Sequence, residues 1–129
     1  MAESFQYALL RVVPSLPRGE AMNVAIVLHC RRRAFLAVRS HVDEERLRVL
    51  DPSVDVEAVK AHMELLERVA AGEDPDNPIT RLDRSERFGW IVAPSSTVVQ
   101  PSDVHTGLTD DPAATIEKLF AGLVAVPGP

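Results

Sequence analysis

Three short runs rich in β-branched, aromatic and other apolar residues lie within the first 39 positions and most constrain the fold. They cover residues 4–13 (SFQYALLRVV), 20–30 (EAMNVAIVLHC) and 34–39 (AFLAVR). Such runs, bounded by proline, glycine or charged turns, are typical of β-strands. A PSLPRG loop separates the first two runs, and three arginines separate the last two. The short arginine turn predicts an antiparallel hairpin for the second and third strands.

The run 20–30 has two different faces if its side chains alternate regularly. One face then carries Met22, Val24, Ile26 and Leu28, and the other carries Asn23, Ala25, Val27 and His29. The second face has smaller side chains and two polar groups. We therefore expect it to be the more informative face for function.

Helical patterns begin after Ser40. We expect a short helix over 43–50, because Asp51-Pro52 stops it, and a second helix capped by Asp55 that ends at Ala71 before Gly72. A last helix begins at Asp111-Pro112, an N-cap followed by a proline in the first helical position.

The segment between these helices is less regular. Residues 80–93 are ambiguous, although Thr80 followed by Asp83 resembles a capping box. We expect a short strand over 97–100 and an irregular stretch over 101–109.

Three strands, then helices, a late strand and a closing helix predict an α+β fold, with an antiparallel sheet of about four strands and helices packed mainly on one face. The 129 residues are expected to form a single domain over 1–129.

Composition excludes a disordered chain, because 46% of the residues are hydrophobic and 26% are charged. The net charge of −5 argues against a dedicated nucleic-acid binder. The charge is unevenly spread: residues 1–39 carry six arginines and two glutamates, whereas the remainder is strongly acidic. We therefore expect one face of the protein to attract an anion.

A cytoplasmic location is expected from the cysteine content and the apolar runs. Cys30 is the only cysteine, so the chain cannot form an internal disulfide, and a reducing compartment fits it best. We expect no secretory signal and no membrane span, because the longest nearly unbroken apolar stretch, Val24–Leu28, is far shorter than a bilayer requires.

The common cofactor motifs are absent from the sequence. The glycines spell neither a P-loop nor a dinucleotide fingerprint, and there is no Gly-x-Ser-x-Gly elbow. The histidines lack the spacing of a helical zinc site. We therefore expect no cofactor and no metal, and the sequence leaves open whether the protein is an enzyme.

The first candidate site combines Arg11, Arg18, Glu20 and Asn23. Arginine presents a planar fork to a carboxylate or phosphate, and Glu20 has the chemistry to accept protons or to orient an arginine. Gly19 permits close approach of the backbone. The alternative is structural: an ion pair that fixes a loop, with Asn23 satisfying backbone groups.

The second candidate site lies in the polar stretch 95–107, where His105 and Thr106 are the residues of interest. A histidine pKa near neutrality suits a general acid or base. The alternative is a loop held by its own hydrogen bonds.

The string YALLRVVPSLPRGEAMNVAIVLHC resembles the opening of a family of short bacterial proteins known as domain of unknown function 3037. The residues that carry the resemblance include an Arg-Gly-Glu-x-x-Asn motif; they are Tyr7, Arg11, Pro14, Arg18, Gly19, Glu20 and Asn23. The segment APSSTVVQPSDVHTGLTDDP and the helix around Leu119 also resemble family members. The resemblance implies no catalytic residues. It does imply a kinase-like protein partner, because members are described beside a gene for a HipA-like kinase.

The leading hypothesis is a non-enzymatic accessory or interaction module with a kinase-like partner. The alternative is an enzyme or binding protein for a phosphorylated or carboxylated small molecule, which requires Arg11, Arg18, Glu20 and His105 to form one cluster. A third interpretation is a homodimer joined through an exposed sheet edge.

Overall fold

The computed structural model describes residues 1–15, 17–94 and 98–125. Within them, five antiparallel strands form one sheet in the order β3–β2–β1–β4, and β5 also pairs with β1. The strands are β1 (Glu3–Val12), β2 (Met22–Cys30), β3 (Phe35–Ser40), β4 (Val99–Pro101) and β5 (His105–Thr109). The predicted α+β class and antiparallel sheet are confirmed.

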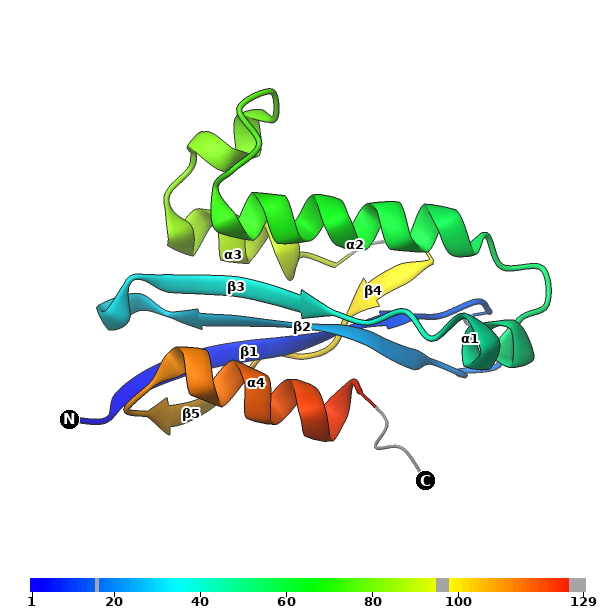
Figure 1. Ribbon diagram of the computed structural model, residues 1–129, viewed down its shortest axis with the longest axis horizontal. Helices are drawn as coiled ribbons and strands as arrows, with labels where there is room; N and C mark the ends of the chain where they lie inside the picture. The colour runs from blue at the N-terminus through cyan, green and yellow to red at the C-terminus, as the bar shows by residue number, and fades with distance from the viewer. Residues whose placement is uncertain (16, 95–97, 126–129) are drawn as a thin grey trace.

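Helices cover both faces of this sheet (Figure 1). The α-helices are α1 (Glu44–Leu50), α2 (Val56–Ala71), α3 (Arg84–Ile91) and α4 (Pro112–Leu123), and two 3-10 turns are η1 (Arg31–Arg33) and η2 (Pro78–Arg81). Figure 1 shows α2 and α3 on one side of the sheet and α4 on the other. No helix in the described ranges is long and apolar enough to cross a membrane.

The predicted helix ends are confirmed by their local hydrogen bonds. The Asp55 carboxylate accepts from the backbone N–H of Ala58, and the Asp111 carboxylate accepts from that of Ala114. Gly72 ends α2 in the left-handed conformation, with φ of 71°. In the ambiguous segment, Asp83 rather than Thr80 caps α3 through the N–H of Glu86.

β1 is the central strand, because it is paired along both edges. β2 lies along one edge. The other edge is shared: residues Glu3–Tyr7 pair with β5, and Leu10–Val12 pair with β4. The prediction of an irregular stretch over 101–109 was therefore wrong for residues 105–109, where pairing with β1 makes a strand. Thr97, the first residue of the strand expected over 97–100, lies outside the described residues.

A β-bulge in β2 overturns the simple alternation expected for this strand. Leu10 pairs with Ala25 whereas Arg11 pairs with Asn23, so Val24 is the extra residue. Met22 and Val24 therefore pack with Ala25 and Val27 on the α2 side, and not with Ile26 and Leu28, which face α4. The bulge also places Asn23 and His29 on opposite faces.

The core has two parts separated by the sheet. The part between the sheet and α2–α3 includes the fully buried residues Leu10, Val12, Leu47, Met63 and Val69. The part beneath α4 contains Phe5, Ile26, Leu28, Cys30, Ile116 and Val124. A strand buried on both faces needs apolar side chains at successive positions, which explains the nearly continuous apolar sequence of β2.

Arg87 fastens α3 to the end of α2. Its side chain is 9% exposed, and its guanidinium donates to the carbonyl oxygens of Leu82 and Ala70, at 2.6 and 3.4 Å. The Ala70 carbonyl lies in the last turn of α2, where backbone acceptors lack helical partners. Arg87 thus links the C-terminal end of α2 to α3 across the loop that joins the two helices.

Position 107 needs a glycine because the backbone of β5 lies directly against the ring of Phe5. A Cβ at this position would lie 2.7 Å from two ring carbons of Phe5, which is itself buried. We therefore expect Gly107→Ala to lower the free energy of unfolding by about 1–3 kcal/mol through overpacking. Gly122→Ala in α4, where a Cβ meets nothing within 4 Å, is the control and should raise it by up to about 1 kcal/mol. Urea unfolding measures both, and effects of the same sign would contradict this account.

Candidate functional site

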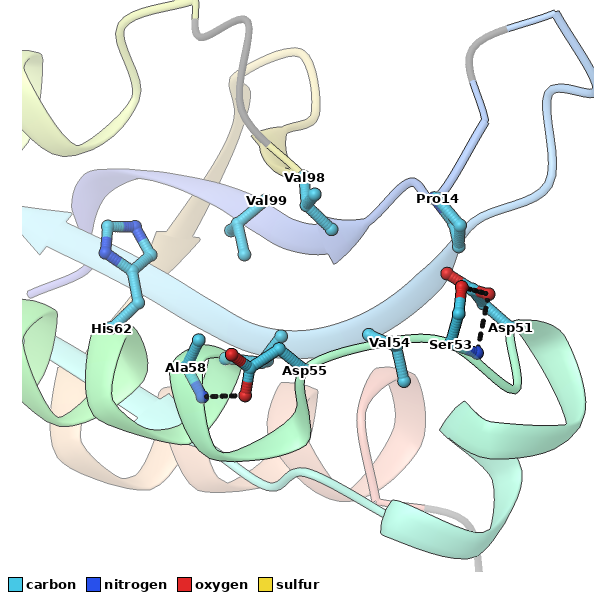
Figure 2. A pocket seen from close by; sticks show the side chains of 10 residues that line it. Pro14, Asp51, Ser53, Val54, Asp55, Ala58, His62, Val98 and Val99 are labelled. Carbon is cyan, nitrogen blue, oxygen red and sulfur yellow. Dashed lines mark hydrogen bonds between the residues drawn. The ribbon is translucent and has the colours of Figure 1, made fainter.

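A cleft of about 370 Å³ lies between the first turns of α2 and the chain that enters β4. We call it the α2–β4 cleft, and its lining comes from three parts of the chain. It is lined by Pro14, Asp51, Ser53, Val54, Asp55, Ala58, Val59, His62, Val98 and Val99. Figure 2 shows His62 at one end of the cleft and Asp51 and Ser53 at the other. A cleft of this size, mostly apolar with a few polar groups, is typical of a binding site.

Local hydrogen bonds hold the turn that forms one end of the cleft. One carboxylate oxygen of Asp51 accepts from the backbone N–H and the hydroxyl of Ser53, at 3.0 and 2.8 Å. Asp55 similarly uses one oxygen to cap α2. The second carboxylate oxygen of each aspartate has no partner among the described residues. Two acceptors are therefore available to a bound molecule at this end.

The opposite wall is fixed by pairing beyond β1. The N–H of Val13 donates to the carbonyl oxygen of Val98 at 2.7 Å, which continues the β1–β4 ladder toward the cleft. Val98 is 47% exposed whereas Val99 is 8% exposed. The valine pair thus presents one side chain to the core and one at the mouth of the cleft (Figure 2).

His62 is the polar residue on the α2 wall. Burial lowers its pKa below the ordinary value of 6.5. The imidazole is therefore neutral at pH 7, with one nitrogen able to donate and the other able to accept a hydrogen bond. It offers a neutral hydrogen-bonding group within an otherwise apolar wall.

Arg18 and Glu20 lie beside this cleft. They line a neighbouring pocket of about 300 Å³ that shares Pro14, Asp51 and Ser53 with it. Their side chains form an ion pair of 2.5 Å and are 72% and 42% exposed. Gly19, with φ of 68°, supplies the turn between them. Two predicted site residues are thus next to the α2–β4 cleft.

Arg11 and Asn23 lie elsewhere, on the α4 face of the sheet. They are cross-strand neighbours, and Gln100 of β4 lies opposite Arg11 on its other side. The Asn23 amide donates to the carbonyl oxygen of Leu123 at the end of α4, at 3.0 Å. This bond agrees with the structural alternative for Asn23. The Nε of Arg11 is buried without a hydrogen-bond partner among the described residues.

His105 and Thr106 are adjacent in β5 and point to opposite faces. His105 pairs with Tyr7, and their ring centroids are 5.2 Å apart. Thr106 pairs with Gln6 and lines a third pocket, near α3. Three further polar residues of that candidate stretch, Ser95, Ser96 and Thr97, lie outside the described residues.

The structure does not bring Arg11, Arg18, Glu20 and His105 into one cluster. His105 is opposite Tyr7, four positions before Arg11 on β1, which corresponds to about 13 Å along a strand. Arg18 and Glu20 follow the far end of β1. The register of the sheet therefore separates the groups that the small-molecule hypothesis requires together.

The cleft residues themselves were not identified from the sequence. From the sequence, His62 is placed beside the apolar residues of α2, and Asp51 and Asp55 are accounted for as helix-stop and capping residues. The spacing of His62, three residues after buried Val59, places it at the edge of the stripe. That spacing alone does not distinguish a covered histidine from one that faces a cavity.

Fold and cleft together define a small α+β protein with helices on both faces of an antiparallel sheet and a largely apolar cleft at one end. Within the described ranges, no three His, Cys, Asp or Glu side chains gather as a metal site would need. The family model described as "Protein of unknown function (DUF3037)" matches residues 7–124, so the chain belongs to this family. Comparisons with curated proteins and with solved structures gave no match.

Acid should destabilise the protein through its partly buried histidines. The pKa values of His29 and His62 are both lowered, chiefly by burial. Below pH 6.5 the unfolded chain therefore binds more protons than the folded protein. The stability that comes from keeping these histidines neutral is fully present above pH 6.5 and is lost progressively as the pH falls below that value. Each histidine contributes at most about 1.4 kcal/mol per pH unit.

Urea unfolding between pH 5 and pH 7.5 measures this dependence. His62→Gln removes one titrating group, so its stability should fall less steeply over this range than that of the unchanged protein. Equal slopes for the two proteins would show that His62 makes no such contribution.

Proposed function

We propose that this protein is a non-enzymatic interaction module that binds a segment of a partner protein in the α2–β4 cleft. The observation that carries the proposal is the juxtaposition of a 370 Å³ apolar cleft with the Arg18–Glu20 pair. An apolar pocket bordered by a polar, solvent-exposed rim is the usual composition of a protein interface.

The chemistry of the cleft indicates what such a segment contains. The valines, Ala58 and Pro14 favour an apolar side chain. The unpartnered oxygens of Asp51 and Asp55 favour hydrogen-bond donors or a positive charge next to it. We therefore propose a segment with an apolar residue beside a lysine or arginine.

Two further features of the proposal come from the sequence. The resemblance to short bacterial proteins described beside a HipA-like kinase gene makes a kinase of that class the first partner to test. A bacterial cytoplasmic location is supported by the single cysteine, Cys30, which is a buried free thiol.

Filling the cleft should abolish partner binding. Ala58 lines the cleft, and Ala61 is an exposed alanine in the same helix that does not. We expect Ala58→Phe to weaken binding at least tenfold, because the ring occupies the space for the partner's side chain, and Ala61→Phe to leave it unchanged. Affinity purification from the host with mass spectrometry identifies the partner, and titration with the purified partner compares the variants. Equal affinity for the two variants would exclude the cleft as the binding site.

Reversing a charge beside the cleft should change binding but not folding. Arg18 and Glu20 are largely exposed, and an exposed ion pair contributes less than about 1 kcal/mol to stability. Because the proposed segment carries a lysine or arginine, Arg18→Glu should strengthen partner binding while changing the unfolding free energy by less than about 1 kcal/mol. Exposed Arg81→Glu, on η2 and away from both pockets, is the control. Partner affinity that is insensitive to Arg18→Glu would remove this pair from the interface.

A further inference from the structure

A row of polar side chains crosses the sheet at the opposite end of β1, on the face that α3 covers. Register places Gln6 between His29 of β2 and Thr106 of β5, and directly opposed residues share a face. The same face carries Ala8, Leu10 and Val12 farther along β1, which are buried and apolar. The change from apolar to polar occurs at Gln6 and marks a distinct surface.

These residues line a pocket of about 340 Å³, which we call the polar pocket. Its lining joins the strands to η1 and α3, and includes Ser4, Phe5, Gln6, His29, Arg31, Ser85, Phe88 and Thr106. It shares no residue with the α2–β4 cleft. Its polar lining residues other than His29 are exposed, so this end of the sheet face is open to solvent.

His29 is the most informative group in the polar pocket. It is 5% exposed, and its ring packs against Phe88 with centroids 5.2 Å apart. Neither ring nitrogen has a hydrogen-bond partner among the described residues. The ring nitrogens are not among the buried side-chain atoms that lack a partner, so they reach the open space of the pocket. His29 therefore presents a hydrogen-bonding group to the pocket.

Arg31 supplies positive charge to the same pocket. The other arginines of η1 have partners: Arg32 lies 3.9 Å from Glu3, and Arg33 donates to the carbonyl oxygen of Met1. Arg31 lines the pocket and forms no ion pair or hydrogen bond among the described residues. Its charge helps to lower the pKa of Asp83, the N-cap of α3, but of these three arginines it is the one without an ion pair or hydrogen bond.

All the polar side chains that line the pocket can donate a hydrogen bond, and no carboxylate is among them. The complementary ligand is rich in acceptors and negatively charged. We infer that the polar pocket binds the phosphate group of a small phosphorylated molecule, held by Arg31, His29, Gln6 and Thr106. Arginine and several neutral donors around one site are the usual means of holding a phosphate.

The charged groups that act on His29 are consistent with this assignment. Arg31 and Arg84 disfavour protonation of its ring, whereas Asp83 favours it, and burial lowers its pKa more than any of the three. A bound dianion would offset the two arginines and raise that pKa.

The first test titrates the protein with inorganic phosphate at pH 7 and constant ionic strength, and follows the Gln6 side-chain amide and the His29 ring by NMR. We expect saturable shifts at both. Arg31→Gln should weaken binding about tenfold, the effect of losing one charge-assisted hydrogen bond. Arg32→Gln makes the same change of charge in the same turn and should leave the affinity within about twofold.

The second measurement uses sulfate, a tetrahedral dianion whose charge is constant between pH 5 and pH 8. The pKa of His29, followed by NMR, should rise when sulfate saturates the pocket, and Arg31→Gln should require more sulfate for the same rise. Three outcomes would overturn the inference: no saturable shift at Gln6 and His29, an equal loss in the Arg31 and Arg32 variants, or a His29 pKa that sulfate leaves unchanged. Partner binding at the α2–β4 cleft is a separate result, so either proposal can fail alone.

Discussion

The pairing of β1 along both of its edges is the constraint on which the rest of the structure depends. Its ten residues connect β2 to two separate short strands, and each of its faces is covered by a different helical layer. Its buried backbone groups need hydrogen-bond partners. Along one edge β5 and β4 supply them for Glu3–Tyr7 and Leu10–Val12, and Ser102, between those two strands, pairs with the N–H and the carbonyl of Leu9.

The two pockets follow from where this pairing ends. Beyond Val12 the chain leaves the sheet as a proline-containing loop, and the space between that loop and α2 becomes the α2–β4 cleft. At the other end, Gln6 and Thr106 line the polar pocket beside α3 and are exposed. The positions of the helices over the sheet thus determine which parts of this face are core and which are open.

Features that depend on neighbouring residues could be predicted from the sequence. Three kinds of feature depend only on local sequence: the strands before residue 40, the caps at Asp55 and Asp111, and the glycine that ends a helix at Gly72. The proximity of Arg18 to Glu20 is also local, because a single residue separates them. β5 was missed because HTGLT has one large apolar side chain, and Leu108 is 73% exposed. Its extended conformation comes from pairing with a strand about a hundred residues away, which no local pattern records.

The candidate site was only partly predictable for the same reason. A bulge of one residue at Val24 moves Asn23 to the face opposite His29, and nothing in an unbroken apolar run indicates where the extra residue falls. Register likewise sets the separation between Arg11 and His105. The chemistry of individual residues was visible in the sequence, whereas their grouping depends on long-range pairing.

Arg87 gives the helical layer a mechanical property. Because its guanidinium holds the last turn of α2 and the segment before α3 together, the two helices resist sliding against each other on the sheet. One of them forms a wall of the α2–β4 cleft and the other a wall of the polar pocket. Arg87 thus joins the helix that lines one pocket to the helix that lines the other, and it lies next to Phe88 of the polar pocket.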